Sequence, residues 1–520
     1  MTRSKGKARP IGNGSVTSAA PGSISINGSA PESISINGNA PESLKKRDPP
    51  RPNNRSSRKY KHTSVVHLEN CSSCLSHDAA TAPSFLGFRN LMGLVLVMSN
   101  LRLMMENSKK YGILVTLSGI NISADDWRWF ATLYVMTPGF LFLAWGIESL
   151  AAQFAKDVVA RQKRLEDSDE GGDEIELEVA KKTLFSRWAN IAIAHGANAT
   201  VMLVFTTYVV YYLIHNPALG AFTELHAVIV WLKVCSYAFT NRDLRLALLN
   251  RDPEDAALPD LYKTCPYPQN VTVSNLAYFW LAPTLVYQPV YPRTAKINWS
   301  YVGKRAAECV LLCIVIWILC AQYAVPVMQN SLAAISDLNA ISILERTLKL
   351  STISLLCWLA GFFALFQSFL NGLAEVMRFG SRDFYDDWWN SASVRGYWTT
   401  WNKPVTHFMK RHIYAPMVGR GVPRTLAQIL TFLLSGVLHE LLVGVPTHNI
   451  LGVAFFGMAL QLPLIFLTDP LARHKSQNAQ LLGNLVFWIF FCILGQPFAA
   501  LIYFFAWQTK YGGDTRPKWP

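Results

Sequence analysis

Charged residues are scarce in this sequence, and its cysteines form no regular pattern. Asp, Glu, Lys and Arg make up 16% of the 520 residues, whereas apolar residues make up 51%. This balance disfavours several soluble domains and favours a membrane protein. The nine cysteines are scattered, several inside apolar runs, so we expect no disulfide framework. No stretch resembling a removable signal peptide opens the chain, so we expect the N-terminus to stay in the cytosol.

Several familiar functional signatures are also missing. There is no Gly-x-Ser-x-Gly turn and no phosphate-binding Walker loop. The net charge of +14 is spread between apolar runs rather than gathered in one stripe, which argues against nucleic-acid binding. Histidines and cysteines with the spacing of metal ligands occur only in an isolated group near the N-terminal tail, namely His67, Cys71, Cys74 and His77. We therefore expect no metal site and no cofactor.

The chain divides into a polar tail and a long apolar region. Residues 1–62 are rich in Ser, Asn, Gly, Pro and basic residues, which predicts a disordered basic cytosolic tail that we extend to residue 82. Because a spanning helix needs roughly 20 mainly apolar residues, residues 83–510 predict an all-α polytopic domain with about nine transmembrane helices. The expected spans are 88–106, 127–150, 188–214, 219–239, 304–326, 350–376, 426–446, 450–468 and 483–507.

The charges between the spans predict the orientation of the chain. Basic residues gather in the loops that face the cytosol if the N-terminus does, as the positive-inside rule requires. Nine spans then place a short tail, 511–520, on the lumenal side. We expect the acidic segment 166–178 to be a solvated loop. The apolar stretch 276–290 is broken by Pro283 and Pro289, which favours a re-entrant or interfacial segment.

His439 is the first candidate for chemistry, since it lies inside the predicted span 426–446. Ionisable residues within a membrane are rare and usually functional, because burying them in hydrocarbon is costly. Ser435 lies one helical turn earlier, on the same face. A neutral imidazole in a dry cavity can take a proton from a hydroxyl, since imidazole titrates near neutral pH. A structural histidine bonded to a neighbouring helix is the alternative.

Glu440 follows His439 directly and so points roughly 100° away from it on a helix. We therefore expect Glu440 to pair with a polar group on another span. Gln461 and Gln496 lie in later spans and could supply that group or contact a substrate. The alternative for each glutamine is a hydrogen bond between helices.

The segment 384–423 is both aromatic and charged, beginning FYDDWWNSASVRGYWTTWNKPV. Trp and Tyr prefer the membrane interface, and Pro404 after Asn402 breaks any continuous helix. Basic residues follow closely: Lys410, Arg411, Arg420 and Arg424. Such a cationic, aromatic mouth suits a ligand with a phosphorylated head and an apolar tail, and acyl-CoA has that form. A plain amphipathic anchor helix is the alternative.

Four motifs resemble the membrane-bound O-acyltransferase family: FYDDWWN at 384–390, WNKPV at 401–405, RHIY at 411–414 and the HE pair at 439–440. Further stretches at 99–114, 267–293 and 495–497 resemble its type-1 diacylglycerol O-acyltransferase branch, in its fungal or plant form, more than the sterol branch. The resemblance covers most of residues 85–507.

The resemblance implies roles for individual residues. It makes His439 the catalytic base, Asn402 its polar companion, and Glu440 and Gln496 groups near the acyl acceptor. The expected acyl-CoA entrance and substrate pocket comprise Trp388, Asn390, Trp401, Tyr414, Arg424, Ser435, Met458 and Gln461. Asp387 matches the acid of the family motif, whereas relatives carry another basic residue where this chain has Arg424. The resemblance also implies an endoplasmic-reticulum protein that forms dimers or tetramers.

The resulting hypothesis is direct acyl transfer from acyl-CoA to diacylglycerol, with His439 as the general base. A sterol or a long-chain alcohol is the alternative acceptor. Hydropathy alone would also allow a transporter, but the inverted-repeat symmetry typical of many transporters is not evident. A purely structural scaffold would leave His439 unexplained.

Overall fold

The computed structural model describes residues 86–115, 122–167, 174–249, 259–474 and 476–511. Within these ranges the protein is helical and contains no β-strand, which confirms the all-α expectation. Residues 94–520 form one compact unit; the first unit, Met1–Gly93, contributes only the start of α1 to the described residues. The predicted tail 1–82, its His/Cys group and most of the tail 511–520 lie outside the described residues.

The helices follow one another in this order: α1 (Leu86–Tyr111), α2 (Ala124–Asp167), α3 (Glu174–Leu213), α4 (Pro217–Leu249), α5 (Asp260–Lys263), α6 (Val273–Leu281), α7 (Trp299–Ile318), η4 (Leu319–Ala324), α8 (Val325–Gln329), α9 (Leu332–Ser336), α10 (Ala340–Phe362), η5 (Phe363–Phe369), α11 (Leu370–Val376), η6 (Trp388–Asn390), α12 (Val394–Thr400), α13 (Lys403–Phe408), η7 (Met409–Tyr414), α14 (Ala415–Gly419), α15 (Arg424–Gly444), α16 (Val453–Ala459), α17 (Gln461–Arg473), α18 (Gln477–Phe487), η8 (Trp488–Gly495) and α19 (Gln496–Tyr511).

Eight helices among the described residues are long and apolar enough to cross a membrane. They correspond to eight of the nine predicted spans, and the protein is a multi-pass membrane protein. The remaining predicted span, 88–106, forms α1, a helix of 26 residues. It is not one of the eight, because polar residues such as Asn100 and Arg102 interrupt its apolar sequence.

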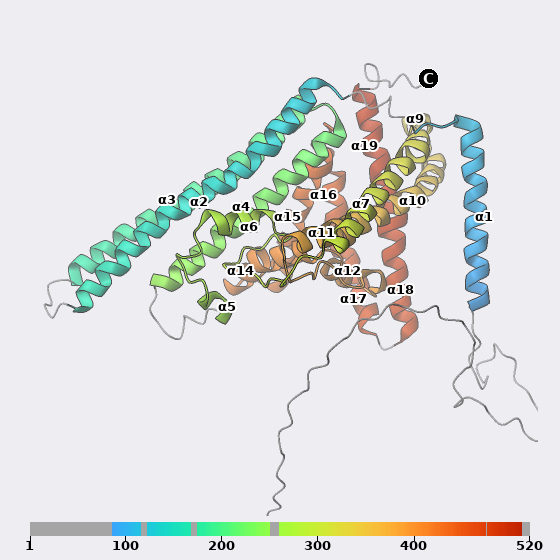
Figure 1. Cartoon of the computed structure of the whole chain (residues 1–520). Helices are drawn as coiled ribbons and strands as arrows, with labels where there is room; N and C mark the ends of the chain where they lie inside the picture. The colour runs from blue at the N-terminus through green and yellow to red at the C-terminus, as the bar shows by residue number, and fades with distance from the viewer. Residues whose placement is uncertain (1–85, 116–121, 168–173, 250–258, 475, 512–520) are drawn as a thin grey trace, which may run out of the picture. The chain divides into compact units, whose positions relative to one another are not determined.

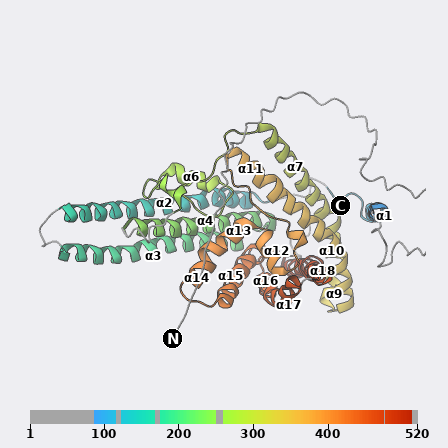
Figure 2. The same ribbon diagram turned by 90° about the horizontal axis from the view of Figure 1, so that it is seen from below.

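Helices α2, α3 and α4 lie side by side (Figures 1 and 2). The prediction of a loop over 166–178 was wrong at both ends, because α2 continues to Asp167 and α3 begins at Glu174. Glu and Lys are good helix formers, and helices can extend beyond the bilayer into water. Acidic composition alone therefore did not locate the end of the helix.

A buried carboxylate links this helical array to the segment that follows it. Glu148 of α2 is fully buried, and its Oε1 atom accepts hydrogen bonds from Arg245 at 2.6 Å and Tyr267 at 2.7 Å. Its Oε2 atom lies 3.4 Å from His195 of α3. A buried charge is tolerated when it is paired and hydrogen-bonded. This cluster therefore fixes α2, α3 and α4 to the chain that follows α5.

A buried lysine stabilises the break predicted within 276–290. Helix α6 ends at Leu281, before Pro283. The Nζ atom of Lys233 on α4 donates to the backbone oxygens of Phe279, Trp280 and Ala282, each at 2.8 Å. These carbonyls lie at the end of α6, where intrahelical donors run out. Lys233 therefore supplies hydrogen-bond donors to the free carbonyl groups at the end of α6 and holds this end against α4.

The segment 384–401 packs into an aromatic core rather than forming an exposed anchor. Trp388 is almost completely buried, with ring centroids 4.9 Å from Trp358 and 5.1 Å from Phe362, both on α10. On the other side, Tyr397 lies 4.4 Å from Phe487 of α18. Aromatic pairs at these separations contribute packing energy beyond the area that they bury. The anchor-helix alternative is therefore not supported.

Candidate active site

His439 lies on α15 with a defined ring orientation. Its Nδ1 atom is 2.7 Å from the backbone oxygen of Ser435. A carbonyl oxygen only accepts hydrogen bonds, so Nδ1 carries the proton and the neutral ring has its lone pair on Nε2. Among the described residues, Nε2 has no hydrogen-bond partner. The ring is thus prepared to accept a proton through Nε2.

Ser435 is poorly placed to act as a nucleophile. Its hydroxyl oxygen is 3.5 Å from Nδ1 of His439, the nitrogen that already donates to the main chain. A nucleophilic serine needs a base with a free lone pair within hydrogen-bond distance. Ser435 lies beside His439 as predicted, but its backbone rather than its hydroxyl makes the close contact.

Glu440 is buried and fully engaged by neighbouring elements. Its Oε1 atom accepts from the backbone N–H of Gly452 at 2.8 Å, and its Oε2 atom accepts from Tyr503 at 2.8 Å and from the N–H of Phe455 at 3.2 Å. The prediction of a partner on another span is confirmed, but the partner is Tyr503 of α19 rather than Gln461 or Gln496. Glu440 thereby holds α15, α16 and α19 together.

The two glutamines occupy different environments. Gln461 is buried at the start of α17, where it donates to the backbone oxygen of Gly457 at 3.1 Å and lies 3.4 Å from Nε1 of Trp398. Gln461 therefore fits the alternative of a hydrogen bond between helices rather than contact with a substrate. Gln496 begins α19 and is half-buried, with no side-chain hydrogen bond among the described residues. Met458 is buried within α16.

Asn402 is the N-cap of α13. Its side-chain oxygen accepts from the backbone N–H of Val405 at 3.2 Å, and Pro404 occupies the first turn. This is a usual arrangement at the start of a helix, because it satisfies a donor that the helix cannot. The amide nitrogen of Asn402 has no hydrogen-bond partner among the described residues, so a donor remains for another group.

The expected entrance residues from the aromatic segment are mostly packed inside the protein. Trp388 belongs to the aromatic core, and Trp401 stacks on Trp358 at 5.7 Å and on Tyr397 at 5.8 Å. Asn390 is exposed, and its side-chain amide nitrogen lies 3.5 Å from a carboxylate oxygen of Asp387. The two tryptophans are therefore part of the packed core around the site and do not line an open entrance.

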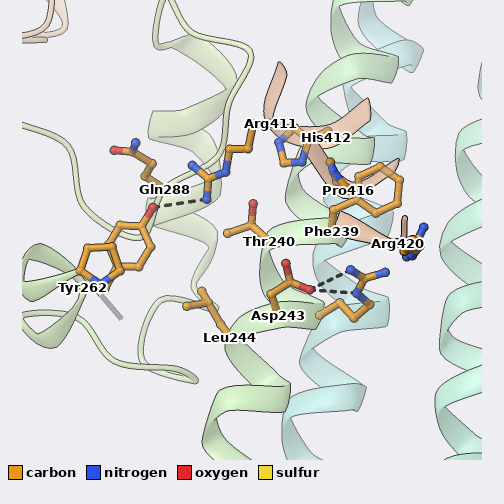
Figure 3. A pocket seen from close by; sticks show the side chains of 12 residues that line it. Phe239, Thr240, Asp243, Leu244, Tyr262, Gln288, Arg411, His412, Pro416 and Arg420 are labelled. Carbon is orange, nitrogen blue, oxygen red and sulfur yellow. Dashed lines mark hydrogen bonds and ion pairs between the residues drawn. The ribbon is translucent and has the colours of Figure 1, made fainter. Parts of the chain in front are cut away.

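A pocket of about 550 Å³ lies between α4, the segment around α5 and the segment η7–α14 (Figure 3). We call it the Arg420 pocket. Its lining residues are Phe239, Thr240, Arg242, Asp243, Leu244, Pro259, Tyr262, Gln288, Arg411, His412, Pro416 and Arg420. Arg411 lies 3.4 Å from the hydroxyl of Tyr262, and Arg242 pairs with Asp243 at 2.8 Å. Three arginines thus face a pocket with only one carboxylate.

A second pocket of about 560 Å³, the Lys410 pocket, shares Gln288 and Arg411 with the first. Its other lining residues are Thr284, Val286, Tyr291, Pro292, Phe379, Ser381, His407, Lys410 and Ala415. Val286 packs in the same apolar cluster as Leu438, the residue before His439. The two pockets therefore lie on the elements that pack against the helix of His439.

The basic residues of these pockets differ in part from those expected. Arg411, Arg420 and Lys410, which belong to the predicted basic group, line the two pockets. Tyr414 and Arg424, which the resemblance placed at the entrance, line neither. On the π-helical segment η7, Tyr414 is three residues beyond Arg411 and presents a different face. Arg242 and Gln288 were missed, because their role depends on the packing of distant segments.

His412, within the RHIY motif, is held neutral by its surroundings. Burial lowers the pKa of His412 to about 4, and the neighbouring charge of Arg411 acts in the same direction. Its Nε2 atom is 2.7 Å from the hydroxyl of Ser236, which also accepts from the backbone N–H of Tyr287. His412 therefore joins α4, η7 and the segment after α6 without adding charge.

Comparison with known proteins gives a consistent set of matches. A family model for the membrane-bound O-acyltransferase family matches residues 199–505. The chain is 35% identical to diacylglycerol O-acyltransferase 1A of Glycine max, over 87% of this chain and 84% of that protein. It is 35% identical to diacylglycerol O-acyltransferase 1 of Corylus americana, over 87% and 78%. It is 34% identical to diacylglycerol O-acyltransferase 1-2 of Oryza sativa subsp. japonica, over 86% of each.

Proposed function

Because the chain belongs to the membrane-bound O-acyltransferase family, we propose that it transfers a fatty acyl group from acyl-CoA to the free hydroxyl of diacylglycerol, forming triacylglycerol. The observation that carries this proposal is the similarity to proteins named diacylglycerol O-acyltransferase, at about 35% identity over 87% of the chain. The match to the family model, residues 199–505, includes all of α15 with its His439.

The reaction is a direct transfer with His439 as the general base. Nε2 takes the proton of the acceptor hydroxyl while its oxygen attacks the thioester carbonyl. The new C–O ester bond forms, the C–S bond breaks, and CoA leaves as a thiol after it receives the proton from His439. The bond from Nδ1 to the Ser435 oxygen supports this role, since it keeps the Nε2 lone pair available.

Asn402 and Glu440 are assigned supporting roles. The free amide N–H of Asn402 is suited to stabilise an oxygen that gains negative charge during attack. Glu440 acts as a positioning residue, because its two oxygens are occupied by Gly452, Phe455 and Tyr503 and are not available to a substrate. Gln496 retains its hydrogen-bonding groups and is the better candidate for contact with the acceptor.

The phosphorylated head of acyl-CoA is assigned to the Arg420 and Lys410 pockets. Their cations, Arg411, Arg420 and Lys410, provide charge-assisted hydrogen bonds for phosphates. The apolar cluster that contains Val286 and Leu438 connects these pockets to the helix of His439. The arrangement supports a donor whose head lies at the pockets and whose thioester reaches Nε2.

We assign the protein to the endoplasmic-reticulum membrane, with a cytosolic N-terminus and a lumenal C-terminus. This orientation needs α1 as a ninth span. The end of α1 is joined to the end of the α7–α8 span, because Gln322 bonds Asn107 and the backbone of Gly112 and Leu114 at 2.8–2.9 Å. With 26 residues, α1 is about 38 Å long, enough to cross a bilayer. A homodimer or homotetramer is the assembly expected by resemblance.

The experiment that tests this function compares acceptors. Purified full-length protein is incubated with radiolabelled acyl-CoA and, in parallel, with diacylglycerol, a sterol or a long-chain alcohol. We expect labelled triacylglycerol from the wild-type protein, and a rate lower by roughly 10²–10⁴ from the His439→Ala variant. A preference for the sterol or the alcohol would overturn the assignment of the acceptor. Wild-type activity of His439→Ala would overturn the mechanism.

A further inference from the structure

A groove of about 340 Å³ lies between α3 and α4, away from α15 and its histidine. Most of its lining is aliphatic or aromatic, including Ile191, Ala199, Val234 and Leu246. Both helices are membrane spans, so the surroundings of the groove are lipid. The volume is near the lower limit of ligand pockets, which suits one chain rather than two.

The polar lining of this groove is entirely cationic or potentially cationic. Apart from a cysteine, its only polar residues are His195, Arg242 and Arg245, and no acidic residue lines it. Arg245 is engaged by Glu148 at 2.6 Å. Arg242 is about half exposed, and both of its hydrogen bonds go to Asp243, which leaves further N–H donors. The groove therefore complements an anion.

His195 is the most deeply buried polar residue of the groove after Arg245. Its side chain is 8% exposed, and its Nδ1 atom has no hydrogen-bond partner among the described residues. The other ring nitrogen lies 3.4 Å from Glu148. A buried polar atom without a partner is uncommon in native proteins, since it forfeits its hydrogen bond to water. The Nδ1 atom has almost no accessible surface, so a carboxylate in the groove meets Arg242 rather than His195.

The groove also adjoins the site assigned to the acyl donor. Phe239 and Arg242 of α4 line both the groove and the Arg420 pocket. The cationic end of the groove is thus the end nearest to that pocket, while Ala199 and Val234 lie further along the two spans. An occupant would place its polar group beside Arg242 and its tail along the apolar part.

We propose that the α3–α4 groove is a binding site for a long-chain fatty acid, separate from the site of acyl transfer. The carboxylate binds at Arg242, and the single alkyl chain lies along Ala199, Val234 and Ala238. The proposal goes beyond acyl transfer and does not depend on the identity of the acceptor. Binding involves no covalent step.

The test uses full-length protein in phosphatidylcholine nanodiscs and a palmitic acid that carries a photoreactive diazirine. After irradiation, labelled peptides are mapped by mass spectrometry. We expect label on residues 188–199 and 234–246, displaced by unlabelled palmitate. Methyl palmitate, which lacks the charge, should compete about tenfold less well, as expected for loss of a charge-assisted hydrogen bond. Label that neither competitor displaces would overturn the proposal.

Two glycines provide a matched pair of variants. Gly196 lines the groove, and a Cβ at this position would have no heavy atom within 4 Å, so Gly196→Leu starts a bulky side chain in open space at the groove. Gly139 of α2 is also exposed with nothing within 4 Å, and it does not line the groove. Gly196→Leu should remove most of the label, whereas Gly139→Leu should keep it. Equal labelling of the two variants would contradict a site in this groove.

Discussion

The Nδ1 atom of His439 lies 2.7 Å from the backbone oxygen of Ser435, one turn earlier in α15. A main-chain acceptor cannot be removed by a change of side chain, so the orientation of the imidazole is set by the helix itself. Because this bond fixes the proton on Nδ1, the opposite nitrogen is the basic one. This hydrogen bond gives His439 and Ser435 different roles, whereas the sequence showed only that the two residues lie one turn apart.

The first prediction contrasts these two residues. His439→Ala should lower the rate of acyl transfer by roughly 10²–10⁴, the usual contribution of a general base. Ser435→Ala should retain most of the activity, because it keeps the carbonyl to which Nδ1 donates. Initial rates with radiolabelled acyl-CoA measure both effects. A loss for Ser435→Ala as large as that for His439→Ala would show that the hydroxyl takes part in the reaction.

The second prediction concerns Tyr503. Tyr503→Phe keeps the aromatic ring but removes the 2.8 Å hydrogen bond to Glu440 and the 3.1 Å bond that the hydroxyl accepts from the N–H of Ala454. A lost hydrogen bond to a buried carboxylate costs about 1–3 kcal/mol, so the midpoint of thermal unfolding and the activity should both fall. Tyr208→Phe on the exposed surface of α3 is the control, since no hydrogen bond of its hydroxyl occurs among the described residues. Equal unfolding midpoints for the two variants would contradict the positioning role of Tyr503.

The third prediction tests how closely the Glu440 side chain is enclosed. A Cβ at Gly444 would lie 2.7 Å from Oε1 of Glu440 and 3.0 Å from the backbone oxygen of Asn449, whereas one at Gly457 would meet nothing within 4 Å. Gly444→Ala should therefore destabilise the protein, by about 1–3 kcal/mol as is usual for overpacking. Gly457→Ala should be neutral or slightly stabilising, since Ala favours helix. Denaturation in a defined detergent compares them.

The fourth prediction concerns the cations of the Arg420 pocket. Arg420→Gln should raise the KM for acyl-CoA by about tenfold, the value of one charge-assisted hydrogen bond. The kcat should change little, because the phosphates are bound alike before and during the reaction. Arg473→Gln, at an exposed position outside the two pockets, is the control. Equal KM values for these variants would place the CoA head elsewhere.

The fifth prediction follows from the lowered pKa of His412. The pKa of about 4 in the folded protein is below the usual value of 6.5. Between these values the unfolded chain binds a proton that the folded chain does not, so stability falls as the pH is lowered through this window. His412→Gln, which keeps a polar group near Ser236, should lose less stability between pH 7 and pH 5. Parallel decreases in the unfolding midpoint would contradict this assignment.

The sequence by itself determined the elements whose physics is local. Long apolar runs predict spans because lipid leaves no partner for the backbone except within a helix, and eight of these spans agree with the structure. The positions of the break near Pro283 and of the break before Pro404 also follow from neighbouring residues, although Lys233 on another helix then stabilises the first of them. The acidic segment 166–178 was misassigned because its composition describes exposure to water rather than the end of a helix.

The tertiary structure alone decided which distant groups meet. Glu440 bonds Tyr503, 63 residues later, and neither hydropathy nor spacing could select Tyr503 over Gln461 or Gln496. Gln288 and Arg411 line the same two pockets only because the segment after α6 packs against η7. Trp388 resembled an entrance residue, but its neighbours on α10 make it part of the core. Hydrogen bonds and packing depend on distance in space, and periodicity along a chain describes only one helix at a time.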